Sequence, residues 1–469
     1  MNWIKKNIYY ILGILTLLFF LFGQGVMWYA IGGDSETYYI YFRHRMEVAP
    51  LYPLFFHILD LIFGRAGYLY AAAVVQMLVA LVSIILFVRF IGTRMKLDIG
   101  SIVVVWICSL FPFYLLLPED PIPHVLMTES FTYPLMYIYI TMILKAVFDH
   151  KEKYFFYSML FVEVMALIRG QMMFLFAVSI VIYFFWYIKQ YFQEKKEKHG
   201  FFKKIFGRMV LLLASALLSV LVGKGLTSAY EKVFFDAHAQ SFANHVAIQK
   251  ALYCSDEEDA ALFEDKIERE IFEKTYAEMK KEGTTYRFTN EGLHSWKYAI
   301  GRAAANSWLV QDAIKEVLIA NDLWSENALE QEDLILYYEG KMSKPLFKDN
   351  VKQYINLFFI CIPAGFVSTV LFHKDSIYLL IHIATVFLYL AAVGVSIFVS
   401  KKSRRLLPES EYMMLIVITA SGNVFASNLV HFGLQRYLAY TVGMFYVGAY
   451  LLVRRCFLLW KERKVVRKQ

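Results

Sequence analysis

Long apolar runs alternate with short polar loops along most of the chain. The runs approach the roughly 20 residues that a helix needs to cross a bilayer. They predict spanning helices at 8–30, 67–91, 99–117, 127–148, 154–168, 172–191, 208–228, 377–400, 411–431 and 435–458. Of the 469 residues, 58% are hydrophobic and 17% are aromatic, which is rare in soluble domains. The pattern predicts an all-α, multi-pass membrane protein.

Two further apolar stretches do not fit as crossings. The stretch 50–64 is short and contains two prolines and Asp60, which favours a helix lying in the membrane interface. The stretch 354–372 is long enough to span, but a crossing there would move the basic loops that follow it to the other side of the membrane. We therefore expect 354–372 to be interfacial or re-entrant.

Basic residues gather in the loops on one side of the predicted helices. Because short cytoplasmic loops are rich in Lys and Arg, we place this side, with both termini, in the cytoplasm. The loops 31–50, 118–126 and 229–352 then face outward, and the short chain with Lys-rich loops favours a bacterial plasma membrane. The basic positions are Lys5 and Lys6, Arg89 to Lys96, Lys151 and Lys153, Lys189 to Arg208, Lys401 to Arg405, and Arg454 to Lys468.

The segment 229–352 differs from the remainder in charge. It contains 15 Lys and Arg against 23 Asp and Glu, a net charge of −8, whereas the remainder contains 33 against 17, a net charge of +16. The positive charge therefore lies in the short loops of the membrane part, which is typical of membrane topology rather than of a nucleic-acid-binding face. The four cysteines show neither metal-ligand spacing nor a disulfide pattern.

Helical periodicity in 229–352 predicts a small, mostly helical outward domain. Apolar residues recur at helical spacing between Asp256, a plausible N-cap, and Gly283, a plausible stop, and 306–324 reads as a second amphipathic helix. The chain thus divides into a transmembrane module at 1–228, whose outward loops are 31–66 and 118–130, this domain, and an interfacial segment with transmembrane helices at 353–469. The tryptophans of the domain either pack a core or contribute to acceptor choice; they are Trp296, Trp308 and Trp324.

Two carboxylates mark the outward loops as candidates for chemistry. Asp34 follows the first helix, and Glu129 starts the helix after the second outward loop. A carboxylate there can take a proton from a hydroxyl, while the other orients it, binds a sugar hydroxyl or holds a cation. Each has a structural alternative, because Asp34 follows Gly32-Gly33 in a turn, and Glu129 follows the potential N-cap Thr128 and suits the helix dipole.

Cations and metal donors lie at the same predicted face. Arg436 and Arg169 can each bind a phosphate bidentately or reach toward lipid headgroups. A divalent metal is left open, because several oxygen and nitrogen donors share the face without a specific ligand spacing. These donors are Asp34, Glu36, His44, Asp120, His124 and Glu129.

The order of five short motifs resembles the GT-C glycosyltransferases, the superfamily that includes dolichyl-phosphate-mannose protein mannosyltransferases and bacterial aminoarabinose transferases. In that family an Asp follows the first helix, a Pro-rich amphipathic segment comes next, a Thr-Glu pair opens the fourth helix, an Arg follows the short fifth, and Arg-Tyr opens a late helix. The matching motifs here are "GGDSETYY", "APLYPLFFHILDLIFG", "MTESFTYPL", "ALIRGQMMFLF" and "QRYLAYTVGMFY".

The resemblance implies a GT-C-like bundle and transfer of a sugar, with inversion, from a polyprenyl-phosphate carrier to an envelope glycan, lipid or protein. It implies that Asp34 is the catalytic base, Glu129 the second acid and Arg436 a phosphate ligand. From these motifs, and from the loop between the first two of them, we predict substrate contacts by Glu36, Arg43, His44, Tyr52, Arg169, Gln435, Arg436 and Tyr437. The double proline of the family is Ala49-Pro50 here, and 229–352 does not resemble the β domains of some relatives.

Two other functions are compatible with the sequence. A transporter or flippase of lipid-linked saccharides needs charged groups near the membrane midplane and often contains repeats, whereas the charges here gather at helix ends and the halves look dissimilar. A membrane scaffold whose outward domain binds a partner is the third possibility.

Overall fold

The computed structural model describes residues 2–22, 29–31, 35–39, 49–115, 122–194, 201–235, 243–286, 305–371, 379–403, 406–430 and 435–466. These residues form α-helices, short 3-10 helices and one isolated bridge between Ala30 and Val125. The all-α prediction is confirmed for this part of the chain.

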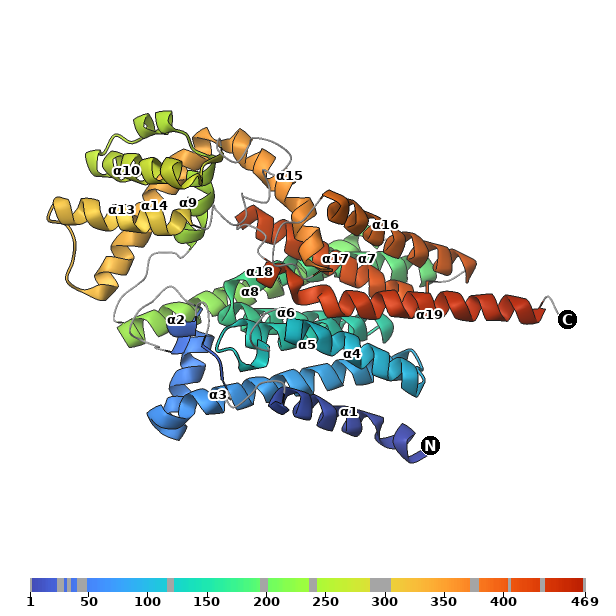
Figure 1. Ribbon diagram of the computed structural model, residues 1–469. Coiled ribbons are helices and arrows are strands. Elements are labelled where there is room, and N and C mark those ends of the chain that lie inside the picture. The colour runs from blue at the N-terminus through green and yellow to red at the C-terminus, as the bar shows by residue number, and fades with distance from the viewer. Residues whose placement is uncertain are drawn as a thin grey trace.

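Most helices form an elongated bundle (Figure 1). Eight helices in the described part are long and apolar enough to cross a membrane, and two shorter apolar helices accompany them. The chain is a multi-pass membrane protein. The bundle helices are α1 (Asn2–Phe22), α3 (Leu51–Arg94), α4 (Ile99–Leu115), α5 (Glu129–Phe148), α6 (Lys153–Ile168), α7 (Phe174–Glu194), α8 (Phe201–Phe235), α15 (Val351–Ser368), α16 (Leu379–Lys402), α17 (Pro408–Val430) and α19 (Val442–Val466).

Burial separates central helices from peripheral ones. In the most apolar window of each helix, 72% of α5 is buried inside the protein but only 17% of α8. α5 packs between α3 and α6, whereas α8 presents long apolar side chains outward, as a lipid-facing helix does. Polar residues on α5 are therefore surrounded by protein.

Gly64 divides α3 into two helical parts, 51–63 and 65–94. Its φ of 69° and ψ of 172° interrupt the helix, a conformation that glycine adopts without steric cost. Figure 1 shows the first part turning away from the direction of the second. The separate short helix expected at 50–64 is this first part, and its place in the membrane interface stays a prediction.

The segment expected to be interfacial at 354–372 forms α15, an uninterrupted helix of 18 residues. It is among the eight helices that are long and apolar enough to span. In Figure 1 it runs obliquely to α16, α17 and α19. The number of crossings, and with it the orientation of the chain, stays a prediction.

Two helix boundaries predicted from the sequence are wrong. The helix expected at 8–30 does not continue to residue 30, because Ala30 is extended: its N–H donates to His124 O at 3.0 Å and its carbonyl accepts from Leu126 N at 3.1 Å. The helix expected at 435–458 is three pieces, α18 (Gln435–Leu438), η4 (Ala439–Thr441) and α19. Side-chain amides bind the carbonyls of this turn, as described below.

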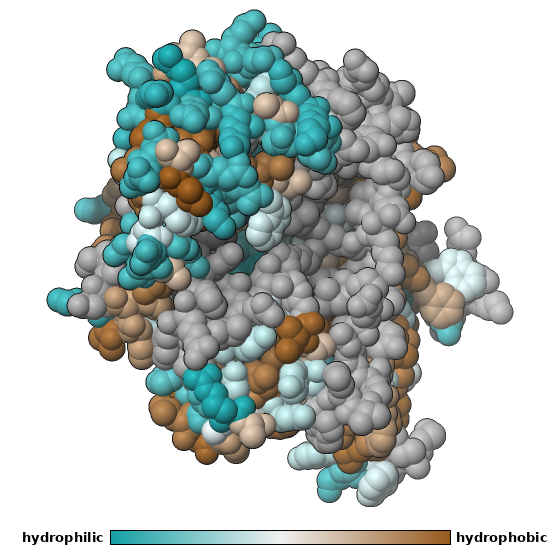
Figure 2. Space-filling view, turned by 60° about the vertical axis from the view of Figure 1, so that its left-hand side comes forward, coloured by the Kyte–Doolittle hydropathy of each residue, from teal (hydrophilic) through white to brown (hydrophobic). Residues whose placement is uncertain are grey.

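A helical head domain lies at one end of the bundle, opposite the end where α1 begins and α19 finishes (Figure 1). Figure 2 shows hydrophilic side chains over much of its surface. It consists of α9 (Ala243–Cys254), η3 (Glu257–Leu262), α10 (Lys266–Glu282), α13 (Asn306–Ala320) and α14 (Ala328–Asp349) around its own apolar core. We call the bundle end that carries it the head end.

Local signals explain the helices of the head domain. Asp265 caps α10 through the N–H groups of Ile267 and Glu268, and Gly283 ends it with φ 65°. Asp256 caps the short η3 instead, so the single helix expected from 256 to 283 is two helices. Trp324 packs against the domain core, Trp308 is 66% exposed, and Trp296 lies outside the described residues.

Candidate functional site

A buried ion pair joins two loops at the head end. The Nη1 atom of Arg169 lies 2.7 Å from Oε2 of Glu129, and the side chains are 13% and 3% exposed. Thr128 Oγ1 accepts a hydrogen bond from Arg169 Nη1 at 2.5 Å and donates one to Glu129 Oε2 at 3.1 Å. Little water screens these charges, so their attraction is stronger than that of an exposed pair.

The loop before Glu129 is fixed from three sides. Gln76, fully buried in α3, donates to Val125 O at 2.9 Å and to Pro123 O at 3.3 Å. Ser130 Oγ also donates to Val125 O, and Ala30 bridges to the same segment. α5 therefore begins from a rigid loop, and Glu129 points into the protein instead of into water.

Arg169 ends α6 in an extended conformation and faces an aromatic ring. With φ −154° and ψ 111° it leaves the helix, and its guanidinium lies 4.6 Å from the ring centroid of Tyr437. Its Nε donates to Gln171 Oε1 at 3.4 Å. The low exposure of the side chain and the pairing with Glu129 exclude the alternative that Arg169 reaches out to lipid headgroups.

Gln171 joins this arginine to α17 and to the turn before α19. It lies in η2 (Gly170–Met173). Its Nε2 donates to Tyr437 O at 2.9 Å, to Ser427 Oγ at 3.0 Å and to Asn423 Oδ1 at 3.3 Å. Asn423 Nδ2 donates to the same carbonyl of Tyr437 at 2.9 Å. These bonds occupy carbonyls that a continuous helix would use, which accounts for the break between α18 and α19.

Phenols and aromatic rings form one wall of the site. Tyr52, 1% exposed, lies in edge contact with Tyr38 at 5.2 Å and with Phe131 at 5.8 Å, between ring centroids. Tyr133 and Tyr440 pack at 4.3 Å, and Tyr440 OH lies 3.2 Å from Thr132 Oγ1. Glu129 is 3% exposed, and the Tyr52 phenol donates to Gln76 Oε1 at 3.2 Å.

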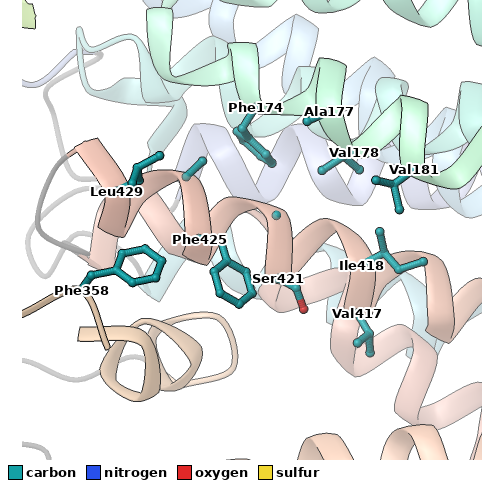
Figure 3. A pocket seen from close by; sticks show the side chains of 12 residues that line it. Phe174, Ala177, Val178, Val181, Phe358, Val417, Ile418, Ser421, Phe425 and Leu429 are labelled. Atoms are coloured by element: carbon teal, nitrogen blue, oxygen red, sulfur yellow. The ribbon is translucent and has the colours of Figure 1, made fainter. Parts of the chain in front are cut away.

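An apolar groove runs along the bundle from the level of Gln171. Its cavity volume is about 500 Å³. Figure 3 shows Phe174, Val178 and Val181 of α7 opposite α17, with Phe358 of α15 at one side. Gly422 permits the close approach of the two helices, because a Cβ there would lie 2.4 Å from Val178 Cγ2. The groove is lined almost entirely by aliphatic and aromatic side chains.

The structure brings four predicted site residues together: Glu129, Arg169, Tyr52 and Tyr437. Asp34, Arg43 and His44 lie outside the described residues. Glu36 lies in α2 (Ser35–Tyr39), and Gln435 and Arg436 lie in α18, but their side chains are outside the described part. α2 follows Asp34 directly and packs against α3 beside Tyr52.

The predicted metal donors do not gather among the described residues. His124 is 2% exposed, and its Nε2 lies 2.7 Å from Phe20 O at the end of α1. No group of three His, Cys, Asp or Glu side chains that is fit to hold a metal occurs in the described part. Asp120 lies outside it, as does Asp34.

Sequence reasoning missed Gln76, Gln171, Asn423 and Ser427. The available signal was a polar residue inside an apolar run: Gln76 lies within 67–91, and Asn423 and Ser427 are one helical turn apart within 411–431. A buried amide must find partners, so such positions mark a polar network, although the sequence does not reveal the partners.

Comparisons of the chain with family models, with curated proteins and with solved structures found no match. Function must therefore be inferred from the site.

Proposed function

We propose that the protein transfers a sugar from a polyprenyl-phosphate donor to an acceptor hydroxyl at the head end of the membrane bundle. The observations that carry this proposal are the buried Arg169–Glu129 pair and an apolar groove whose first residue on α7, Phe174, lies five residues after Arg169 in the chain. A lipid-linked phosphate needs both features, a fixed cation for its head and an apolar channel for its tail.

Arg169 is the proposed phosphate ligand. Its Nη1 and Nε are engaged, whereas Nη2 makes no hydrogen bond to any residue in the described part. Glu129 and Tyr437 hold the guanidinium plane, so it does not have to reorganise when a phosphate arrives. This assigns to Arg169 the phosphate-binding role that the sequence resemblance gave to Arg436, and the two arginines can share it.

The groove is the proposed path of the prenyl chain. From Phe174 to Val181 it follows α7 for about 10 Å toward the middle of the bundle, at 1.5 Å per helical residue. Apart from the hydroxyl of Ser421, the lining offers no side-chain hydrogen-bond partner to a head group. We propose that a lipid bound there directs its phosphate toward the head end, where Gln171 lies one helical turn before the groove residue Phe174.

Asp34 is the proposed base. In the reaction the acceptor oxygen forms a bond to the anomeric carbon, the bond from that carbon to the phosphate oxygen breaks, and the hydroxyl proton passes to the carboxylate. The polyprenyl phosphate leaves with its added charge facing Arg169. The helix that follows Asp34 in the sequence, α2, packs beside Tyr52. Glu129 acts by holding Arg169.

The test uses purified protein in detergent and a panel of polyprenyl-phosphate sugars with candidate acceptors. The proposal predicts release of polyprenyl phosphate together with a new glycosidic product, and loss of both in Asp34→Asn. Asp98→Asn is the matched control, since Asp98 lies at the opposite end of the bundle beside Ser101. Movement of lipid-linked saccharide across proteoliposomes without any glycosidic product would instead establish the transporter alternative.

A further inference from the structure

We propose that Gln171 is a positioning residue that sets the angle at which Arg169 meets the donor phosphate, through one amide group that binds both the arginine and the turn beneath it. This inference rests on the proposed function. It adds a residue that the motifs of the sequence did not single out.

Both ends of the Gln171 amide are used. Oε1 accepts from Nε of Arg169 at 3.4 Å, while Nε2 donates to the carbonyl of Tyr437 at 2.9 Å. The ring of Tyr437 lies against the guanidinium of Arg169, at 4.6 Å. Gln171 therefore restrains Arg169 in two ways. It binds the Nε of the guanidinium directly, and it binds the backbone of Tyr437, whose ring packs on the guanidinium face.

The turn would be poorly fixed without this amide. α18 has only four residues and passes into a 3-10 turn, so the carbonyls of Tyr437 and Leu438 depend on side-chain donors. Asn423 and Gln171 share the carbonyl of Tyr437, and Ser427 Oγ accepts from Gln171 and donates to Asn423 Oδ1. The network anchors the turn to α17, and Gln171 extends that anchor to Arg169.

A positioning role has a kinetic signature. Gln171→Leu leaves the charge of Arg169 and the groove in place, so donor binding through the tail should persist. The guanidinium then loses alignment with charge that grows on the phosphate in the transition state. A hydrogen bond to a charged group contributes about 1.5–3 kcal/mol, so kcat should fall about 10- to 100-fold while KM changes less than about threefold.

Gln171→Glu supplies a readout that a purely structural role would not produce. A protonated carboxyl has one acceptor and one O–H donor, like the amide, whereas a carboxylate faces the carbonyl of Tyr437 with no donor and also neutralises Arg169. Gln171→Glu should therefore weaken farnesyl phosphate binding at least as strongly as Gln171→Leu, although its side chain has the size of the native glutamine. Wild-type binding of this probe by Gln171→Glu would contradict the inference.

A second assay separates this inference from the proposed reaction. Binding of farnesyl phosphate to the full-length protein in detergent is measured by calorimetry for wild type, Gln171→Leu, Arg169→Lys and the double variant. Farnesyl phosphate carries the second negative charge that the donor phosphodiester gains only as its phosphate leaves, so each single change should weaken binding of this probe even though the KM of the donor changes little. The double variant should bind no more weakly than Arg169→Lys, because Gln171 acts through Arg169. Additive losses, or wild-type binding by Gln171→Leu, would overturn the inference.

The matched control is Gln190→Leu, the same substitution at the other end of α7. It should bind farnesyl phosphate like wild type. If the wild-type protein binds this probe but makes no glycosidic product, the proposed reaction fails. The comparison of the single and double variants in the binding assay still decides whether Gln171 acts through Arg169. If the wild-type protein does not bind the probe, both proposals fail.

Discussion

Nη1 of Arg169 lies 2.7 Å from Oε2 of Glu129, although the two residues belong to different loops. The pair is nearly sealed from water. Thr128 and Gln171 contact it from the same two chain segments, and Tyr437 contacts it from a distant third segment. An acid and a base exposed to water at helix ends would attract each other only weakly. Buried together, Glu129 and Arg169 form a net-neutral pair in which the guanidinium is fixed in one orientation toward a bound anion.

Removing one charge of the pair should lower the free energy of unfolding. Glu129→Gln leaves Arg169 buried with no opposite charge, and breaking a buried pair costs about 3–5 kcal/mol. We expect a lower melting temperature and lost turnover. Asp149→Asn is the control, because Asp149 pairs with Arg94 at 3.2 Å in a more exposed site. Equal melting temperatures for Glu129→Gln and wild type would contradict the pairing.

A double change separates stability from function at this pair. Replacing both members by glutamine, Glu129→Gln with Arg169→Gln, removes the unbalanced charge, so the melting temperature should recover partly toward wild type. Turnover should not recover, because the cation is gone. Thermal unfolding and the release of polyprenyl phosphate are measured on the same preparations.

Blocking the groove should affect donors according to tail length. Ala426 lines the groove on α17, and Ala426→Trp places an indole in the path of the tail. The KM for a long-chain donor should rise at least about tenfold, the effect of roughly 1.4 kcal/mol, while a donor with a single short prenyl unit changes little. Ala214→Trp, exposed on α8, is the control. An equal effect on both tail lengths would contradict this path.

Close packing of α7 against α17 predicts a steric response at Gly422. The new Cβ of Gly422→Ala would lie 2.4 Å from Val178 Cγ2, so one helix must shift and the melting temperature should fall. Gly207→Ala, on α8, meets no atom within 4 Å and should preserve or slightly raise stability, because alanine favours a helix. Equal melting temperatures for the two variants would contradict the packing.

Lys250 makes the junction between the head domain and α17 sensitive to pH. Its side chain is 3% exposed, its ammonium donates to Asn428 O, and burial lowers the pKa of Lys250 to about 8. Above this pKa the folded protein releases the proton that the unfolded chain still holds, up to its ordinary value near 10.4. The stability of the junction should therefore rise with pH between about 8 and 10.

The measurement is the melting temperature between pH 7 and pH 9.5, compared with Lys250→Met. The methionine removes the cost of burying a charge, so the variant should melt higher than wild type at pH 7 and should lack the rise with pH. A parallel pH dependence in both proteins would assign the effect to other groups.

The long helices and several residues of the site could be predicted from the sequence, because hydrophobic length and a few unusual residues at helix ends are local features. Glu129 and Arg169 each stood out in this way, whereas Tyr52 and Tyr437 were predicted from the motifs that resemble a family. The ion pair could not be predicted, since nothing local states that the loop before α5 and the end of α6 meet. The break at 438–441 was missed because the apolar pattern continues through it. The side chains that bind its carbonyls belong to other helical segments, Gln171 in η2 and Asn423 in α17.

The kink at Gly64 and the extended Ala30 show the same limit. The extended conformation of Ala30 comes from a contact distant in sequence. Ala30 pairs with the segment just before Glu129 and so joins the end of the first loop region to the second. The roles of Asp34 and Arg436 remain predictions, and Asp34→Asn tests that of Asp34.

The central claim is that a buried arginine at the head end binds the phosphate of a lipid-linked sugar during transfer. The most direct measurement is the rate of polyprenyl phosphate release, with formation of the glycosidic product, by wild type, Arg169→Lys and the control Arg94→Lys. Arg94 ends α3 and pairs with Asp149. A lysine keeps the charge but loses the planar fork. We predict turnover by wild type and by Arg94→Lys, and at least about a hundredfold loss, roughly 2.7 kcal/mol, in Arg169→Lys. Wild-type turnover in Arg169→Lys would contradict the account.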